Sequence, residues 1–138
     1  MSLPTVLVLD DNDLYRTILQ RVLTKKHLKV TAFPDPKTYL ATRKIDHCKQ
    51  NCCSAQCEKN CPCFDFILTD NHMPSMSGLE FFEWCKQHNC KLSIQRKAII
   101  SSMWSEEDLE RAEKLGCLVL DKNSSLDQIE KWIEKSAD

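Results

Sequence analysis

One stretch decides the fold of this chain, Asp65-Phe66-Ile67-Leu68-Thr69-Asp70-Asn71-His72-Met73-Pro74-Ser75-Met76-Ser77-Gly78. Residues 66–69 form a short, mostly apolar run, which is typical of a strand buried on both faces. The run stops at a carboxylate, Asp70. Met73-Pro74 then imposes a turn, because proline fixes its own φ and keeps the preceding residue out of the α region. A lone Asp here is usually only a turn cap, so its interpretation depends on how the other strands end.

Four further apolar runs predict strands, at residues 5–9, 29–33, 98–101 and 117–120. Apolar residues recur at helical spacing in the segments between them, with helices expected to begin near residues 14, 36, 79, 106 and 126. Asp35 is expected to cap the second helix, with Pro36 at its first position. The first helix is expected to carry an apolar stripe of Leu14, Ile18, Leu19, Val22 and Leu23.

The regular alternation of strand and helix predicts an α/β fold, a doubly wound five-stranded parallel sheet with helices on both faces. In such sheets ligands bind beyond the carboxyl ends of the strands. Four strands end there in polar residues, namely Asp10-Asp11, Asp70, Ser101 and Asp121-Lys122. The sequence therefore predicts one polar site at this edge of the sheet.

The chemistry of these residues suits phosphoryl transfer. Three carboxylates packed together raise one another's pKa unless a cation neutralises them, and oxygen ligands in a small site favour Mg²⁺. A carboxylate beside that metal can attack phosphorus and form an acyl phosphate. Lys122 and the hydroxyl of Ser101 would then contact phosphoryl oxygens.

The pattern Asp70-x-x-Met73-Pro74-x-Met76-x-Gly78, together with these strand ends, resembles the response-regulator receiver family (CheY-like) of two-component signalling. The resemblance implies the strand order 2-1-3-4-5 and a phosphorylation-activated domain. Such a domain accepts a phosphoryl group on Asp70 from a sensor histidine kinase or phosphotransfer protein, and signals to a downstream target or output domain. It assists its own phosphorylation and dephosphorylation but is not otherwise an enzyme.

The resemblance also implies individual roles. Asp11 would bind Mg²⁺ directly, Asp10 would act through water, and the backbone carbonyl of His72 would complete the metal site. Ser101 and Lys122 correspond to the family's hydroxyl and lysine. Two positions depart from the pattern. Asn123 stands where a proline is usual, and Val119 stands where a switching Tyr or Phe is common.

The composition restricts the remaining possibilities. An apolar fraction of 42% and a charged fraction of 28% are ordinary for a globular protein. A net charge of -1 gives no electrostatic footprint for direct nucleic-acid binding. No apolar run approaches the ~18 residues of a membrane span, and there is no secretory segment. We expect a single cytoplasmic receiver domain over residues 1–138.

Residues 46–63, between the second helix and the third strand, form a cysteine-rich insert that the family does not explain. Six of the nine cysteines lie there: Cys48, Cys52, Cys53, Cys57, Cys61 and Cys63. Dense thiolates in a reducing compartment suggest a Zn²⁺ site, with redox disulfides or inert thiols as alternatives. Cys90 would be an additional ligand, whereas Cys85 and Cys117 are expected in the core.

Two other functions remain open from the sequence. Asp11-x-Asp13 after the first strand also suits a haloacid-dehalogenase-type phosphatase, although that function leaves the Met73-Pro74 turn unexplained. In the other alternative, the domain is only a scaffold for a metal or thiol sensor. Trp104 is expected on the loop beside the site, where it would report on phosphorylation.

Overall fold

The computed structural model describes residues 3–46, 64–88, 90, 92–124 and 126–136. Most of the cysteine-rich insert is outside these ranges. The predicted Zn²⁺ ligands Cys48, Cys52, Cys53, Cys57, Cys61 and Cys63 therefore lie outside the described residues, and the zinc site stays a prediction.

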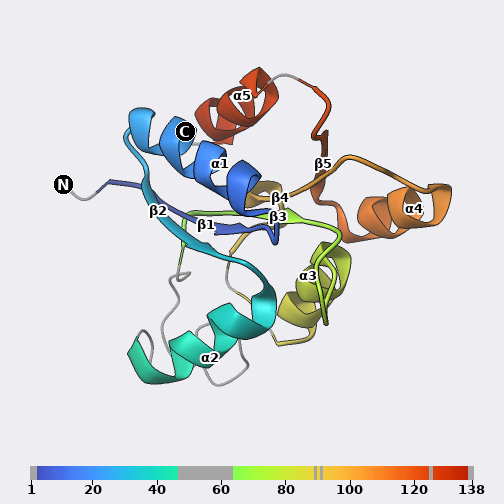
Figure 1. The fold of residues 1–138 in the computed structure, drawn as a ribbon. Coiled ribbons are helices and arrows are strands. Elements are labelled where there is room, and N and C mark those ends of the chain that lie inside the picture. Colours follow the sequence, from blue (N-terminus) through green and yellow to red (C-terminus); the bar gives the residue numbers. More distant parts are fainter. Residues whose placement is uncertain (1–2, 47–63, 89, 91, 125, 137–138) are drawn as a thin grey trace.

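The described elements alternate along the chain as the sequence predicts. They are β1 (Thr5–Leu9), α1 (Asp13–Lys25), β2 (Lys29–Phe33), α2 (Pro36–Asp46), β3 (Phe66–Asp70), α3 (Gly78–Gln87), a 3-10 turn (Ile94–Arg96), β4 (Lys97–Ser101), α4 (Glu106–Leu115), β5 (Leu118–Asp121) and α5 (Asp127–Ser136). The strands form one parallel sheet in the order β2-β1-β3-β4-β5. The predicted doubly wound fold and strand order are thus confirmed (Figure 1).

Helices cover both faces of the sheet and enclose two hydrophobic cores (Figure 1). On one face, α1 and α5 pack through Leu23 and Trp132 against alternate residues of the strands. On the other, α2, α3 and α4 contribute Tyr39, Phe82 and Ala112. Cys85 and Cys117 lie in this second core, as predicted. The central strands β3 and β4 are buried along their whole length, which fixes the positions of the residues at their ends.

Local sequence explains where the helices begin. The side chain of Asn12 accepts a hydrogen bond from the backbone N–H of Tyr15 at the start of α1. Asp35 accepts one from the N–H of Thr38 over 2.8 Å, which confirms the predicted cap of α2. Ser77 forms a capping box at the start of α3. These caps hold the loops that leave the carboxyl ends of β1 and β3.

The apolar stripe of α1 is narrower than the sequence suggests. Leu14 is 72% exposed and Ile18 is 37% exposed. They are four residues apart and share one side of the helix. The side that packs on the sheet carries Tyr15, Leu19 and Leu23 instead. Leu14 and Ile18 thus follow the helical spacing that predicted α1, but they lie outside the side of the helix that packs on the sheet.

Smaller differences concern the ends of the other elements. Strand β5 runs from Leu118 to Asp121, one residue later than predicted. Helix α3 ends at Gln87 with His88 as its cap. On α4, Leu109 is 42% exposed, and Ala112 is the residue that this helix buries fully.

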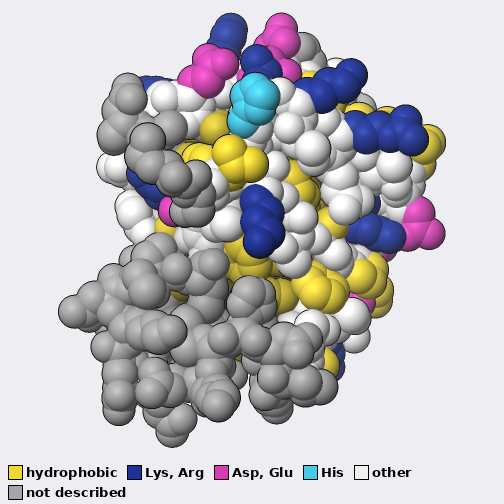
Figure 2. Space-filling model, turned by 90° about the vertical axis from the view of Figure 1, so that its left-hand side faces the viewer, with side chains coloured by type: hydrophobic (Ala, Val, Ile, Leu, Met, Phe, Trp, Pro, Cys, Tyr) yellow, Lys and Arg dark blue, Asp and Glu magenta, His cyan; other side chains and the backbone are white. Residues whose placement is uncertain are grey.

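Strand β2 forms one edge of the sheet, and residues 30–33 are only half-buried. On the left-hand side of Figure 1, where the strands begin, hydrophobic side chains are interspersed with lysines and arginines (Figure 2). Among the helices that the structure describes, none has the length and apolar character needed to cross a bilayer.

Candidate functional site

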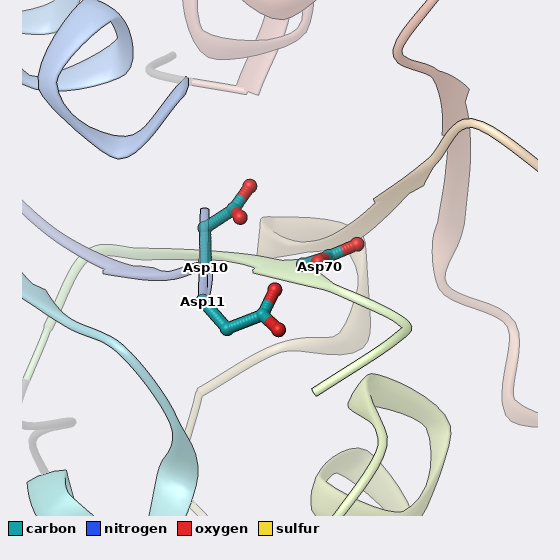
Figure 3. Close-up of side chains that lie close together, drawn as sticks. All are labelled: Asp10, Asp11 and Asp70. Carbon is teal, nitrogen blue, oxygen red and sulfur yellow. The ribbon is translucent and has the colours of Figure 1, made fainter. Parts of the chain in front are cut away.

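Three carboxylates meet at the carboxyl edge of the sheet. Oxygen atoms of Asp10, Asp11 and Asp70 lie within 4.8 Å of one another (Figure 3). The sheet register explains this, because Leu9 of β1 pairs with Thr69 of β3 and the next residues in each chain segment are Asp10 and Asp70. Asp10 and Asp70 are buried, whereas Asp11 faces solvent.

Lys122 reaches this cluster from the end of β5. Its Nζ lies 2.9 Å from Oδ2 of Asp10 and 3.5 Å from Oδ2 of Asp70, and its side chain is 15% exposed. Its backbone N–H donates to the carbonyl of Ser101 over 3.0 Å, so the end of β5 is fixed to that of β4. The cluster therefore combines three carboxylates with one ammonium group.

The charge at Asp70 is only partly compensated. Burial, and next the charge of Asp10, raise the pKa of Asp70 to about 6. Lys122 and the backbone N–H of His72, which lies 3.4 Å from Oδ1, act in the opposite direction. Oδ2 of Asp10 is buried and accepts no well-formed hydrogen bond from the described residues, although Lys122 lies nearby. The negative charge of these carboxylates is therefore not fully compensated, and they would attract a further cation.

Ser101 is placed at the end of β4, one strand away from Asp70. It is fully buried. Its Oγ donates to the carbonyl of Met103 over 2.9 Å and accepts from the N–H of Met103 over 3.2 Å. The hydroxyl thus fixes the start of the β4–α4 loop, and its contact with a phosphoryl group stays a prediction.

His72 bridges two loops of the site. Its side chain is exposed, and Nε2 lies 3.3 Å from the carbonyl of Met103 in the β4–α4 loop. The backbone N–H of His72 points to Asp70. The metal-binding role predicted for its backbone carbonyl stays a prediction.

In the turn after Asp70, position 78 has no space for a side chain. A Cβ on Gly78 would lie 2.5 Å from the backbone carbonyl oxygen of Asp70. The N–H of Gly78 donates to the carbonyl of Asn71 over 3.1 Å, and the side-chain oxygen of Asn71 accepts from the N–H of Leu79 over 3.2 Å. The start of α3 therefore lies directly against the backbone of Asp70.

Three residues near the site were not predicted from the sequence. The guanidinium of Arg16 donates to the carbonyl of Asp10 over 2.6 Å. The ring of Tyr15 lies over Lys122, with Nζ 4.6 Å from its centroid. Asn71 donates to Asp108 of α4 over 3.1 Å. The positions of Tyr15 and Arg16 could have been inferred in part, because both fall in the first turn of the helix that follows the acidic pair Asp10-Asp11.

An open depression of about 630 Å³ lies beside the cluster. It is lined by Asp11, residues 71–77 and Glu80. A small phosphate compound could approach the carboxylates from this side, because Asp11 lies at both the depression and the cluster.

The two departures from the family pattern have visible consequences. The N–H of Asn123 donates to Asp121 over 2.8 Å, and its side-chain amide donates to the carbonyl of Ser102 over 3.3 Å. Asn123 thus joins the β5–α5 and β4–α4 loops. Val119 is half-buried against the second core, where Trp104 also packs.

The fold and the site together define a class, an α/β signalling domain with an acidic pocket and a lysine beyond its central strands. The chain matches the model of the response regulator receiver domain over residues 6–134. It therefore belongs to the response regulator receiver family and is a phosphorylation-activated signalling domain.

A curated relative supports this membership. The chain is 30% identical over 112 residues to a protein of Arabidopsis thaliana described as the two-component response regulator ARR21. The match covers 81% of this chain and 15% of that protein, so the chain spans a small part of the relative's length.

Solved structures show the same fold. Chemotaxis protein CheY4 of Vibrio cholerae has a TM-score of 0.72 at 20% identity, covering 98% of this chain and 99% of that one. A CheY-like receiver domain protein of Methanospirillum hungatei has a TM-score of 0.74 at 20% identity, covering 99% of this chain and 95% of that one.

The phosphatase alternative is not favoured. Asp13, which would be the second acid of that chemistry, has a side chain that is 88% exposed and pairs with Arg16 over 2.6 Å. It is not part of the carboxylate cluster. The acidic residues that do converge are Asp10, Asp11 and Asp70.

Proposed function

We propose that Asp70 is the phosphoacceptor of this receiver domain. The observation that carries the proposal is the position of Asp70, buried at the end of the central strand β3 and flanked by Asp10, Asp11 and Lys122. The open depression, which Asp11 lines, would give a small phosphate compound an approach to this nucleophile from solvent. In the acyl phosphate, one carboxylate oxygen of Asp70 bonds to phosphorus and the leaving group departs from the opposite side.

The residues present suit Mg²⁺. The converging donors are carboxylate oxygens, which this ion prefers, and Asp11 faces solvent so that water ligands can be retained. Asp10, Asp11 and Asp70 would hold the ion, with the backbone carbonyl of His72 completing the set. When bound, Mg²⁺ supplies charge neutralisation for a phosphoryl group that approaches three anions.

Lys122 would hold one phosphoryl oxygen by a charge-assisted hydrogen bond. Its Nζ already lies between Asp10 and Asp70, so little movement is needed. Ser101 would donate to a second oxygen once its hydroxyl leaves the carbonyl of Met103. These groups would also assist the domain's own phosphorylation and dephosphorylation.

The phosphoryl donor would be a histidine-phosphorylated sensor kinase or phosphotransfer protein, because the family and the Arabidopsis relative both belong to two-component signalling. The signal would pass to a downstream protein or an output domain. Phosphorylation would act by shifting the population between two arrangements of the loops around the site.

The test is phosphorylation of the purified protein by acetyl phosphate with and without Mg²⁺, followed by intact-mass spectrometry. Wild type should gain the mass of one phosphoryl group only when Mg²⁺ is present. Asp70→Asn should gain none, whereas the control Asp13→Asn should be labelled like wild type, because Asp13 is exposed outside the cluster. Full labelling of Asp70→Asn would refute the assignment.

A further inference from the structure

A tyrosine of α1 lies against the lysine of the site. The Nζ of Lys122 is 4.6 Å from the ring centroid of Tyr15, a distance at which an ammonium group is attracted by the face of an aromatic ring. The same Nζ contacts Asp10 and Asp70 on its other sides. Lys122 is thus held by two carboxylates and one ring.

Tyr15 is itself firmly placed. Its backbone N–H donates to the side chain of Asn12, the N-cap of α1, over 2.9 Å. Its half-buried ring packs against the core formed by α1, α5 and the sheet. The ring therefore presents a fixed face to the ammonium group, while the lysine stem has four flexible bonds.

The two kinds of contact differ in what they depend on. Attraction to Asp10 and Asp70 depends on carboxylate charges that bound Mg²⁺ would neutralise, and phosphorylation would replace the free carboxylate of Asp70 with a phosphoryl group. Attraction to the ring of Tyr15 does not depend on those charges. We propose that Tyr15 is a positioning residue, whose ring holds the ammonium of Lys122 toward the phosphoryl group when the carboxylates are engaged elsewhere. This inference rests on the proposed function of Asp70.

The proposal concerns the ring face and not the phenol hydroxyl. Tyr15→Phe should therefore behave like wild type, because benzene and phenol rings attract cations similarly. Tyr15→Leu keeps an apolar side chain of moderate size but removes the π face. The exposed neighbour Leu14 offers a control on the same turn, Leu14→Ala.

The first experiment uses the metal-free protein and needs no phosphorylation. Protons above an aromatic ring resonate upfield, so the ε-methylene of Lys122 should lie upfield of exposed lysines in the NMR spectrum. The resonance is assigned by its loss in Lys122→Arg. It should stay upfield in Tyr15→Phe and move to the exposed position in Tyr15→Leu. Lys97, whose Nζ is 5.9 Å from the ring of Phe82, is an internal reference that should not move.

The second experiment measures the affinity of fluoroberyllate, a phosphoryl mimic, at saturating Mg²⁺. Tyr15→Leu should bind it about fivefold more weakly, the order expected for one cation–π contact, while Tyr15→Phe and Leu14→Ala bind as wild type does. The Mg²⁺ affinity without fluoroberyllate should stay unchanged in all variants. A merely structural loss in α1 would instead weaken Mg²⁺ binding too, through the adjacent Asp10 and Asp11.

The outcomes separate the two proposals. If wild type shows the upfield lysine but fails to bind fluoroberyllate, the proposed function fails and the ring contact stands. If wild type binds fluoroberyllate and Tyr15→Leu binds it equally well, the positioning role is overturned. An unshifted Lys122 resonance in wild type also overturns it, even if Tyr15→Leu does not fold.

Discussion

The side-chain amide of Asn71 donates to the carboxylate of Asp108 over 3.1 Å and thereby connects the residue after Asp70 to helix α4. Asn71 is 3% exposed and its side-chain oxygen also accepts from the N–H of Leu79. Helix α4 is further attached to α3, because Arg111 pairs with Glu83 over 2.6 Å. These polar contacts can therefore transmit a movement of the turn after Asp70 to α4.

Replacing Asn71 should destabilise the protein measurably. Asn71→Ala removes two hydrogen bonds and leaves the buried N–H of Leu79 without its acceptor, so we expect a loss of about 1–3 kcal/mol in the free energy of unfolding. Asp108→Ala should cost less, because Asp108 is only half-buried. Urea unfolding of both single variants and the double variant measures the coupling free energy between Asn71 and Asp108.

The coupling between these two positions should be about 1 kcal/mol. The matched control is the pair Asn71→Ala with Glu110→Ala, an exposed residue of the same helix, whose effects should simply add. Additive effects for Asn71 and Asp108 would show that the hydrogen bond does not join the loop to α4.

Asp70→Asn should stabilise the metal-free protein at neutral pH. The pKa of Asp70 is raised to about 6 from 3.8 by burial and Asp10, so the folded state binds more protons than the unfolded state between about pH 4 and pH 6. Stability contributed by this residue therefore falls as the pH rises through that window. Removing the charge of Asp70 should raise the free energy of unfolding by about 1–2 kcal/mol at about pH 8 and by little at about pH 4.

Thermal or urea unfolding of the two proteins in chelator across this range checks the prediction. Glu113→Gln, which changes an exposed carboxylate, should show no such difference. Adding Mg²⁺ should stabilise wild type more than Asp70→Asn, because one of the ligands is lost. If the two metal-free proteins keep a constant stability difference from acid to neutral pH, Asp70 is not the titrating group.

Much of the fold and of the site could be predicted from the sequence, because most of the apolar strands stop at a polar residue. The apolar runs before Asp10, Asp70 and Ser101 fixed which residues meet at the carboxyl edge, since parallel strands end on the same side of a sheet. Alternation of strands and helices was sufficient for the fold. The strand order, however, came from the family resemblance and not from the pattern itself.

Two of the residues that sequence reasoning missed, Tyr15 and Arg16, lie on helix α1 and reach the site through the direction of their side chains. Nothing in the spacing of Tyr15 says that its ring faces Lys122, more than a hundred positions away in the chain. Asn71 is polar and follows a buried strand, so it looks like an ordinary turn residue, yet its partner Asp108 is on α4. Periodicity indicated that α1 is a helix, but it does not show that Leu14 is exposed while Leu19 and Leu23 are buried.

Gly78 should be required for the geometry of Asp70. A Cβ at this position would lie 2.5 Å from the backbone oxygen of Asp70, an atom that cannot move without shifting the strand end. Gly78→Ala should therefore cost about 1–3 kcal/mol of stability and slow labelling of Asp70 by acetyl phosphate.

Gly116 provides the control, because a different constraint, its left-handed backbone conformation, favours glycine there. It caps α4 with φ of 83°, where any Cβ is strained, but far from the carboxylates. Gly116→Ala should cost about 1 kcal/mol and leave the labelling rate unchanged in the folded protein. Equal labelling rates in Gly78→Ala and wild type would show that the close approach does not set the position of Asp70.

Trp104 should report on phosphorylation through the β4–α4 loop. Its indole N–H donates to the backbone carbonyl of Leu120 over 3.0 Å, and its half-buried ring packs against the second core. The loop begins at Ser101, whose hydroxyl is bonded to Met103. If Ser101 turns to a phosphoryl oxygen, that bond is lost and residues 102–105 are free to shift, so the environment of the indole changes.

The other two tryptophans should give a steadier background. Trp132 is buried and donates to the carbonyl of Gln95 over 2.9 Å. Trp84 stacks on His88 with ring centroids 4.1 Å apart, and a protonated imidazole quenches indole emission. The titration is therefore done at one fixed pH, so that the contribution of Trp84 stays constant.

Fluoroberyllate and Mg²⁺ should shift the emission of wild type and of Trp84→Phe, and should leave Trp104→Phe nearly unchanged. The reason is that Trp104 alone among the described tryptophans lies on a loop whose anchor, Ser101, is expected to change partner. Val119 offers no aromatic ring to follow the hydroxyl inward, so the indole bonded to β5 would transmit the movement instead. An identical emission change in Trp104→Phe and wild type would place the reporter elsewhere and exclude this loop as the moving part.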